Sequence, residues 1–337
     1  MLTHLRANLL LLVLTLILCS VVYPLALWAV GRSFFPEQAQ GSLLVGPDGA
    51  PLGSKLIAQP FSGDEYFQPR PSAASYNAAA SGASNFGASN PLLRDRVARQ
   101  LGPIVAYAKT GAAHPTTVQK DIENWFAQRT KEKPEWLADW ARANPSIAAN
   151  WAKSDDLIKA YVLKWTEDHP ETLASWRKEH PNPEDKPKPE DVAVDFFASY
   201  AKAHPGTWPS IVEETKPDGK KEKSVQPARE GADLQSAMFD PWLREHPDVQ
   251  LEKVPADLVT TSGSGLDPHV TLEGALYQLD RVAAAWAARA KRDQAQVRSE
   301  IEALLREKTE APIGGLVGAK LINVLEVNLA LRQRYGA

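Results

Sequence analysis

An uncharged apolar run near the N-terminus constrains this chain more than any other feature. After His4 and Arg6, residues 7–30 carry no charge and consist mainly of Leu, Val, Ile and Ala. A helix of that length, rising ~1.5 Å per residue, spans the ~30 Å hydrocarbon core of a bilayer. A cleaved signal peptide is the alternative, but its apolar region is only ~7–15 residues long. We therefore predict a retained transmembrane helix over residues 7–30.

The charges that flank this run predict its orientation. Arg6 and the amino terminus precede the run, whereas Arg32 is followed closely by Glu37. Because basic residues are enriched on the cytoplasmic side of a membrane, we expect residues 1–6 to be cytoplasmic. Everything from Arg32 onward then lies outside the cytoplasm. No later stretch resembles a second span, so the sequence predicts a single-pass protein.

Composition argues against several classes of function. The formal net charge of −3 gives no indication of nucleic-acid binding, which calls for a basic surface. The single cysteine, Cys19, lies inside the apolar run. The rest of the chain therefore has no cysteine for a disulfide, a nucleophile or a metal site. We expect apolar burial alone to stabilise its fold.

The first piece after the anchor, residues 31–103, combines strand and helix signals. Ser42–Gly46 and Lys55–Gln59 predict the two short strands of a hairpin. Asn90 is a suitable helix N-cap because its side-chain oxygen can accept from a free backbone N–H group. Proline follows it at the first helical position, where its missing N–H is not needed. The sequence therefore predicts a helix over Leu92–Leu101.

The last piece, residues 253–337, predicts three helices. Thr271 is an expected N-cap, and apolar residues then recur at intervals of three and four over Leu272–Trp286. A second amphipathic pattern covers Asp293–Lys308. Asn323–Leu331 is apolar and fits a helix or a strand, of which we favour the helix.

The piece between them, residues 104–252, has a different character, since it holds eight of the ten tryptophans. An aromatic residue repeatedly stands five positions before a proline. Proline disfavours the α conformation at the residue before it, so each instance predicts a helix ending at a histidine or asparagine. Pro183–Glu190 and Lys216–Lys223 are predicted linkers. The piece is interpreted as an α-helical insertion, and the residues that precede its repeated prolines are Asn144, His169, His180, His204 and His246.

Four sequence blocks in the flanking pieces resemble the C subunit of the high-affinity potassium-transporting P-type ATPase, the KdpC family. None of the blocks is specific alone, but their order and the single N-terminal anchor agree with the family. The blocks are Tyr66-Phe67-Gln68-Pro69-Arg70-Pro71-Ser72-Ala73, Ser81-Gly82-Ala83-Ser84-Asn85-Phe86-Gly87 with Asn90-Pro91-Leu92, Ser262–Val282, and Asn323–Leu331. The resemblance does not extend to the Trp-rich insertion.

This resemblance implies a fold and a function. The fold class is α+β, with one transmembrane helix and an extracytoplasmic domain that the α-helical insertion interrupts. The function implied is that of a non-catalytic accessory subunit of an inner-membrane potassium importer. Its partners would be a P-type ATP-hydrolysing subunit, a potassium-selective pore subunit and membrane lipid. The family is described as a catalytic chaperone that raises the ATP affinity of the hydrolysing subunit.

Nucleotide contact by this chain itself is not predicted. The sequence contains no Gly-rich phosphate loop followed by lysine and no P-type aspartyl-phosphate motif. We therefore expect no cofactor on this chain, and ATP only through the hydrolysing partner.

The block that holds Ser264, Asp267 and His269 admits a hydrolase-like trio, but three members within one short loop rarely assemble a triad. We favour a helix-initiating turn that a partner subunit contacts. The histidines before the repeated prolines admit a metal site, although helix C-termini explain them more simply. The candidate partner-contact residues are Tyr66, Phe67, Arg70, Ser84, Asn85, Ser262, Ser264, Asp267 and His269.

Two alternative functions stay open at this point. One is a membrane-anchored envelope-binding protein whose Trp-rich insertion recognises a ligand or a cell-wall polymer. The other is a hydrolase built on the loop that contains Ser264.

Overall fold

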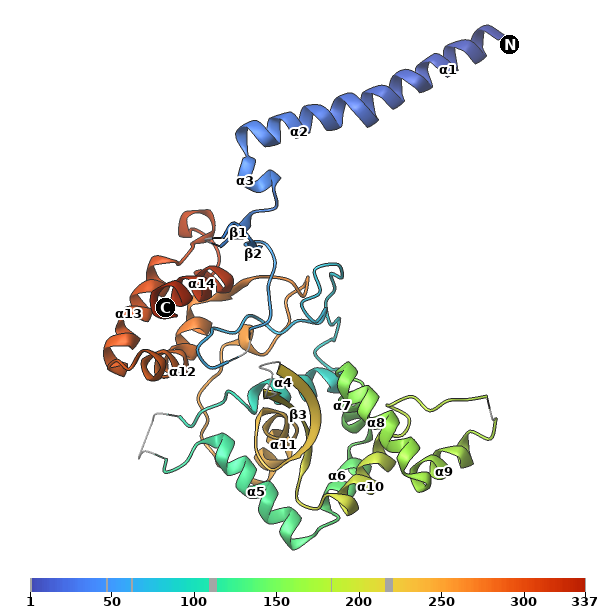
Figure 1. Ribbon diagram of the computed structural model, residues 1–337, viewed down its shortest axis with the longest axis vertical. Helices are drawn as coiled ribbons and strands as arrows, with labels where there is room; N and C mark the ends of the chain where they lie inside the picture. The colour runs from blue at the N-terminus through green and yellow to red at the C-terminus, as the bar shows by residue number, and fades with distance from the viewer. Residues whose placement is uncertain are drawn as a thin grey trace. The chain divides into compact units, whose positions relative to one another are not determined.

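The computed structural model describes residues 2–46, 48–61, 63–108, 114–182, 184–215 and 221–336. The chain forms two compact units (Figure 1). The split unit comprises Met1–Ser84 and Pro255–Ala337, and the central unit comprises Asn85–Val254. Each unit has its own hydrophobic core.

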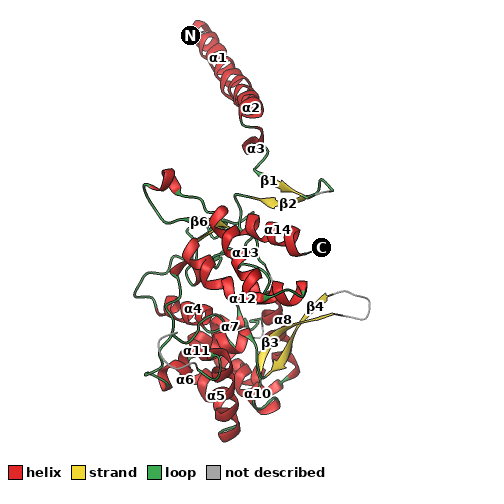
Figure 2. Cartoon of the chain, turned by 90° about the vertical axis from the view of Figure 1, so that its left-hand side faces the viewer, coloured by secondary structure: helices red, strands yellow, loops and turns green. Residues whose placement is uncertain are grey.

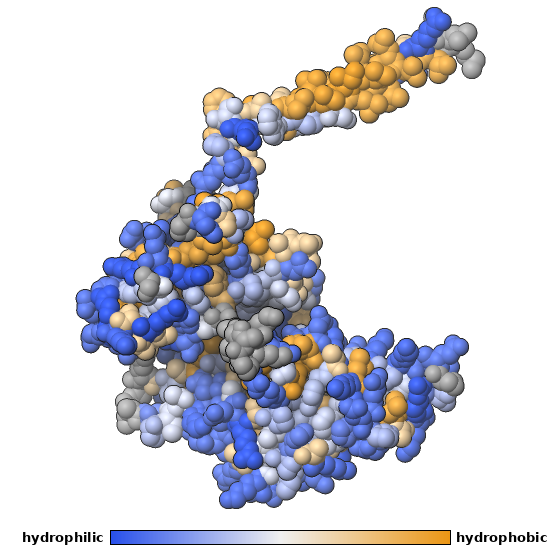
Figure 3. Space-filling model, viewed as in Figure 1, coloured by the Kyte–Doolittle hydropathy of each residue, from blue (hydrophilic) through white to orange (hydrophobic). Residues whose placement is uncertain are grey.

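A long apolar helix opens the split unit. It runs as α1 (Leu2–Ile17), a π-helical turn η1 (Leu18–Val22) and α2 (Tyr23–Phe34). The π turn ends two residues before Pro24, which has no N–H group to donate to the preceding turn. Within the described residues, this is the one helix long and apolar enough to cross a membrane. Figure 3 shows its apolar surface in orange.

A short hairpin follows a single turn of helix, α3 (Pro36–Ala39). Its strands are β1 (Leu43–Val45) and β2 (Pro51–Ser54), paired antiparallel. The predicted second strand at Lys55–Gln59 is wrong, because the chain already turns after Ser54. The Ser54 hydroxyl donates to the carbonyl of Gly41 and accepts from the N–H of Leu56, which ends the strand.

Three helices and one further strand pair complete the split unit. Strand β5 (His269–Thr271) pairs antiparallel with β6 (Leu321–Asn323). The remaining elements are α12 (Leu272–Ala290), α13 (Gln294–Glu307), α14 (Val324–Tyr335) and the short 3-10 turns η2 (Ala256–Leu258) and η3 (Pro312–Gly315).

The predicted helix starts in this unit are confirmed. The side chains of Thr271, Asp293 and Asn323 each accept a backbone N–H from the first turn of the following helix. The core forms around Trp286, which is fully buried and lies 5.7 Å from the ring of Tyr335. The segment Asn323–Leu331 is helical from Val324 onward, which confirms the helix favoured from the sequence.

The central unit is mainly helical. Its helices are α4 (Pro91–Leu101), α5 (Val118–Glu132), α6 (Trp136–Ala143), α7 (Pro145–Ala152), α8 (Asp156–Asp168), α9 (Pro170–Glu179), α10 (Ala193–Ala203) and α11 (Ala232–Glu245). Asn90 caps α4 by accepting from the N–H of Leu92, as predicted. The core is built on aromatic rings, with Trp208 fully buried between Trp140, Trp151 and Phe197.

A β-hairpin corrects the prediction of an all-helical insertion (Figure 2). Strand β3 (Trp208–Thr215) pairs antiparallel with β4 (Lys221–Ala228). The predicted linker Lys216–Lys223 is wrong at 221–223, which belong to β4, while 216–220 lie outside the described residues. Polar contacts between the strands stabilise the pairing of β3 with β4 although both strands carry charged residues. One example is the hydrogen bond from Gln226 Nε2 to Glu214 Oε1 at 3.0 Å.

Helix α4 also lies elsewhere than its sequence position indicates. The prediction assigned residues 31–103 to the domain around the anchor, but α4 packs on α11 in the central unit. Gly102, which follows α4, lies so close to α11 that an added Cβ would clash with the carbonyl of Gln235.

The proline-terminated helices are confirmed. Helices α6, α8, α9, α10 and α11 end with Asn144, His169, His180, His204 and His246 at their C-caps. Three of these histidines place Nδ1 2.8–3.2 Å from the carbonyl of the tryptophan four residues earlier and stack on its ring. Among the residues described, no group of His, Cys, Asp and Glu is arranged to hold a metal ion.

Candidate functional site

Residues 64–68 form a turn at 64–65 and a bend at 66 and are irregular at 67–68, and among the described residues no strand pairs with them. We call residues 64–68 the clasped segment, because side chains from α12 and α14 bind its backbone. Asn328 of α14 is fully buried, and its Oδ1 accepts the N–H of Phe67 at 2.9 Å. Its Nδ2 donates to the carbonyl of Phe67 at 2.8 Å. One amide side chain thus supplies both hydrogen bonds that a paired strand would supply.

Two side chains of α12 complete this arrangement. Gln278 Oε1 accepts the N–H of Gln68 at 2.8 Å, and its Nε2 donates to the carbonyl of Gln68 at 3.2 Å. Arg281 donates to the carbonyls of Asp64 and Tyr66 at 2.8 and 3.0 Å. Burial lowers the pKa of Arg281, which Asp64 partly offsets. The N-terminal and C-terminal parts of the split unit are therefore joined through polar contacts.

The Ser-Gly loop, Thr261–Thr271, lies against a second stretch of the N-terminal part. The N–H of Gly82 donates to the carbonyl of Ser264 at 2.9 Å, and the Ser72 hydroxyl donates to the carbonyl of Gly265 at 2.6 Å. Gly265 has φ of +69°, and a Cβ there would lie 2.7 Å from the carbonyl oxygen of Gly82. Only glycine fits this close approach.

Arg70 connects the clasped segment to the Ser-Gly loop. Its Nη2 donates to the carbonyl of Thr261 at 3.1 Å, and its Nη1 lies 3.8 Å from Asp267 Oδ2. The Tyr76 hydroxyl donates to the carbonyl of Arg70 at 2.8 Å. Burial raises the pKa of Tyr76 to about 12, so this hydroxyl remains a donor at neutral pH.

Asp267 and His269 form an ion pair at the start of β5. Asp267 Oδ1 lies 3.0 Å from both the N–H and the Nδ1 of His269. This contact lowers the pKa of Asp267 and raises that of His269. The exposed Ser264 instead accepts the N–H of Leu266 with its hydroxyl. Within the described part of the chain, no hydrogen bond joins Ser264 to the imidazole, so the three residues form no nucleophile–base relay.

The structure separates the candidate contact residues by exposure. Phe67 and Ser262 are buried, so their side chains serve packing and the loop's own hydrogen bonds. Tyr66 is half-buried with its ring edge-on to Trp286, and Ser84 contacts Thr261 across 3.3 Å. The exposed or half-exposed members of the split unit are Tyr66, Arg70, Ser84, Ser264, Asp267 and His269.

Asn85 falls outside this group. It is exposed, has φ of +53° and belongs to the central unit. Gln278, Arg281 and Asn328 were not predicted as site residues from the sequence. A buried amide in an otherwise apolar stretch, as at Asn328, is the signal that could have identified them, because such a group requires partners.

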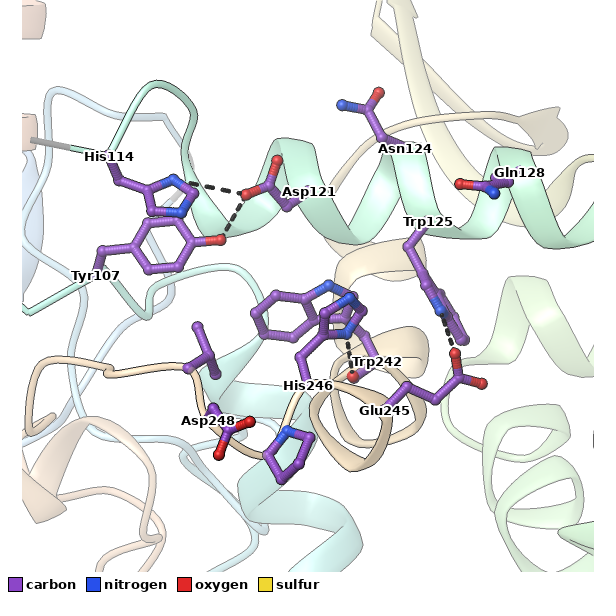
Figure 4. A pocket seen from close by; sticks show the side chains of 12 residues that line it. Tyr107, His114, Asp121, Asn124, Trp125, Gln128, Trp242, Glu245, His246 and Asp248 are labelled. Atoms are coloured by element: carbon purple, nitrogen blue, oxygen red, sulfur yellow. Dashed lines mark hydrogen bonds and ion pairs between the residues drawn. The ribbon is translucent and has the colours of Figure 1, made fainter.

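The central unit contains a separate cavity of about 530 Å³ (Figure 4). Its wall includes the Tyr107 hydroxyl, which donates to Asp121, and Trp125 Nε1, which donates to Glu245 at 2.9 Å. The ring of His114 stacks on Tyr107 at 3.6 Å. Two of its carboxylates are therefore already hydrogen-bonded by neighbouring side chains.

The ion pair of the Ser-Gly loop predicts a specific pH dependence. Asp267→Asn should lower the pKa of His269 toward its ordinary 6.5, because the carboxylate that raises it is removed. In the wild type, the pair contributes its full share of the free energy of unfolding between about pH 3.8 and about pH 6.5. Its contribution is lost as pH rises through the raised pKa of His269, and as pH falls through the lowered pKa of Asp267. It amounts to less than about 1 kcal/mol, because both side chains are partly exposed.

The measurement is an NMR titration of the histidine rings in both proteins, with unfolding free energies at about pH 5.5 and 8.5. Asparagine still accepts the N–H of His269, so the loop is retained. The ring signals of His180, which lies in the central unit, serve as the internal reference. An identical titration of His269 in the two proteins would contradict the pair.

Comparison with known proteins identifies the family. The chain is 45% identical over 96 residues to a protein of Methanosphaerula palustris, covering 28% of this chain and 52% of that protein. It is 48% identical over 105 residues to a protein of Pseudomonas syringae pv. tomato, covering 31% and 55%. Both relatives are named potassium-transporting ATPase KdpC subunit. The chain spans about half the length of the curated relatives it matches.

The family comparison covers far more of the chain. A sequence model of the family described as KdpC, K+-transporting ATPase, c chain, matches residues 5–122 and 223–333. These ranges include the apolar helix, the clasped segment and the Ser-Gly loop, and they leave out 123–222. Because the match extends over more than half of the chain, this protein belongs to the KdpC family.

Proposed function

We propose that this chain is a non-catalytic accessory subunit of a high-affinity, ATP-driven potassium import complex. The observation that carries the proposal is the family match across both parts of the split unit. The relatives are named as subunits of a potassium-transporting ATPase. The partners proposed are the P-type ATP-hydrolysing subunit and the potassium-selective pore subunit.

The geometry supports a role in assembly. The Ser-Gly loop is fixed on one side by Ser72 and Gly82 and presents the exposed Ser264 on the other. A surface fixed before binding loses little conformational freedom when a partner docks. The half-exposed Arg70 and Tyr66 extend this surface. We propose that it contacts the pore or the hydrolysing subunit and stabilises the complex.

Support of ATP binding is then indirect. The chain contains no phosphate-binding loop of the Gly-rich type. We propose that the protein lies in the inner membrane with its N-terminus in the cytoplasm. Residues from Arg32 onward then lie outside the cytoplasm. A chaperone effect on ATP affinity therefore has to pass through the partner subunits.

The central unit supports a second candidate function. Residues 104–252 are proposed to be an insertion, and 123–222 within them have no counterpart in the family match. The cavity of about 530 Å³ is of the size that small-molecule sites have. A membrane-anchored protein that binds an envelope ligand through this unit is the alternative.

The assembly role predicts a dependence of the pump on this chain. Removing the gene should abolish growth at limiting potassium and the potassium-stimulated ATPase of the purified membrane complex. Gly265→Ala strains the Ser-Gly loop. We expect this strain to weaken the binding free energy of docking by ~1.4 kcal/mol, so recovery of the variant chain with a tagged hydrolysing subunit should fall about tenfold.

Gly87→Ala is the matched control, because a Cβ at Gly87 meets open space. It should be recovered with the tagged hydrolysing subunit in the same amount as the wild type. Growth at limiting potassium in the absence of the chain would refute the role.

The proposed topology predicts labelling from outside the cell. Ser264→Cys in a Cys19→Ser background should react with a membrane-impermeant maleimide in intact cells, because residue 264 is exposed. Cys19→Ser alone should remain unlabelled. Ser264→Cys labelled only after the cells are permeabilised would place the loop in the cytoplasm and contradict the proposed orientation.

A further inference from the structure

The segment that follows the apolar helix is attached to the folded part of the split unit through Lys55, among other contacts. The ammonium group of Lys55 lies 2.9 Å from Glu37 of α3 and 3.3 Å from Glu326 of α14. The N–H of Lys55 donates to the carbonyl of Ser42, and its own carbonyl accepts from Asn323 Nδ2 at 2.8 Å. The chain leaving the apolar helix is thus bound to β6 and α14.

The connection between the apolar helix and the hairpin is short. Helix α2 ends at Phe34 and β1 begins at Leu43, so nine residue steps separate them. A fully extended chain covers roughly 3.3 Å per residue, and therefore about 30 Å at most. The helical turn α3 shortens this reach. The hairpin consequently stays close to the membrane surface at which the helix emerges.

Two groups of exposed aliphatic side chains lie at this end of the split unit. On the hairpin, Leu43, Val45 and Leu52 are 48%, 63% and 41% exposed. On the loop between α13 and α14, Leu316 and Val317 are 83% and 63% exposed. We call these five residues the apolar tips. Figures 1 and 2 both show that loop at the same end of the unit as the hairpin.

The loop that carries Leu316 and Val317 is shaped by glycine. Gly314, Gly315 and Gly318 all have positive φ, a conformation that L-residues with side chains rarely adopt. The turn projects two aliphatic side chains away from the unit, where water would surround them. Exposed apolar groups of this kind mark contact with another apolar phase.

We propose that the apolar tips enter the interfacial layer of the bilayer that the N-terminal helix spans, so that the split unit rests on the lipid surface. The short connection through Lys55 fixes this end of the unit near the membrane. Aliphatic side chains on separate protrusions suit a fluid apolar layer, which needs no matching surface. The inference goes beyond the proposed function, because it requires only the membrane helix and no other subunit.

The test uses the full chain with Cys19→Ala and a single Leu316→Cys carrying a nitrobenzoxadiazole probe. The protein is reconstituted into phosphatidylcholine vesicles with and without a lipid that carries a shallow nitroxide quencher. The probe should be quenched at least about twofold and shifted to the blue, since apolar faces at the interface lie ~5–10 Å deep. Ala303→Cys, exposed on α13, is the matched control and should not be quenched.

A second variant separates lipid contact from a change in fold. Val317→Asp alters a side chain that is 63% exposed, so the thermal unfolding of the protein should be retained. With the probe moved to Val45→Cys, this change should reduce the quenching. Probe fluorescence at 316 that the nitroxide lipid affects no more than at 303 would overturn the proposal. A blue shift of the probe at residue 316 that appears only after partner subunits are added would also overturn the proposal, because it would indicate a contact with protein and not with lipid.

Discussion

The split unit depends on side-chain amides that hydrogen-bond the backbone of the clasped segment, as the backbone of a neighbouring strand would. Residues 64–68 belong to no helix or strand and Phe67 is buried, yet within the described chain no strand pairs with them. A buried backbone group without a partner costs ~1–3 kcal/mol. Asn328 satisfies the two backbone groups of the buried Phe67, Gln278 satisfies those of the half-buried Gln68, and Arg281 satisfies two more carbonyls. The helices α12 and α14 therefore hold the N-terminal part of the unit in register.

This arrangement explains how one unit is built from two parts of the chain. The contacts of Asn328 and Gln278 join residues that are separated by 261 and 210 positions. Closing a loop becomes only slowly less favourable as the loop lengthens, so a large central unit between the parts is tolerated. The Ser-Gly loop adds a second junction, since Gly265 lies too close to Gly82 for any side chain.

Local chemistry was predictable from the sequence, whereas long-range pairing was not. The caps Asn90 and Thr271 act through the adjacent helical turn, and proline ends a helix at the residue before it, so both kinds of signal appear in short stretches of sequence. The hairpin β3–β4 was missed because its lysine-rich strand has the composition of a linker, and strand formation depends on what lies opposite. The packing of α4 and the role of Asn328 depend on segments distant in sequence. Those contacts exist only after the chain has folded.

The most direct measurement is amide hydrogen exchange at Phe67 in Asn328→Leu. Leucine has a similar size but can neither accept the N–H of Phe67 nor donate to its carbonyl. The account predicts that protection of this amide falls at least about tenfold, with a loss of ~1–3 kcal/mol in unfolding free energy. Asn124→Leu, at an exposed position of α5, should leave Phe67 protected. Unchanged protection of Phe67 in Asn328→Leu would contradict the claim that side-chain amides hold the unit together.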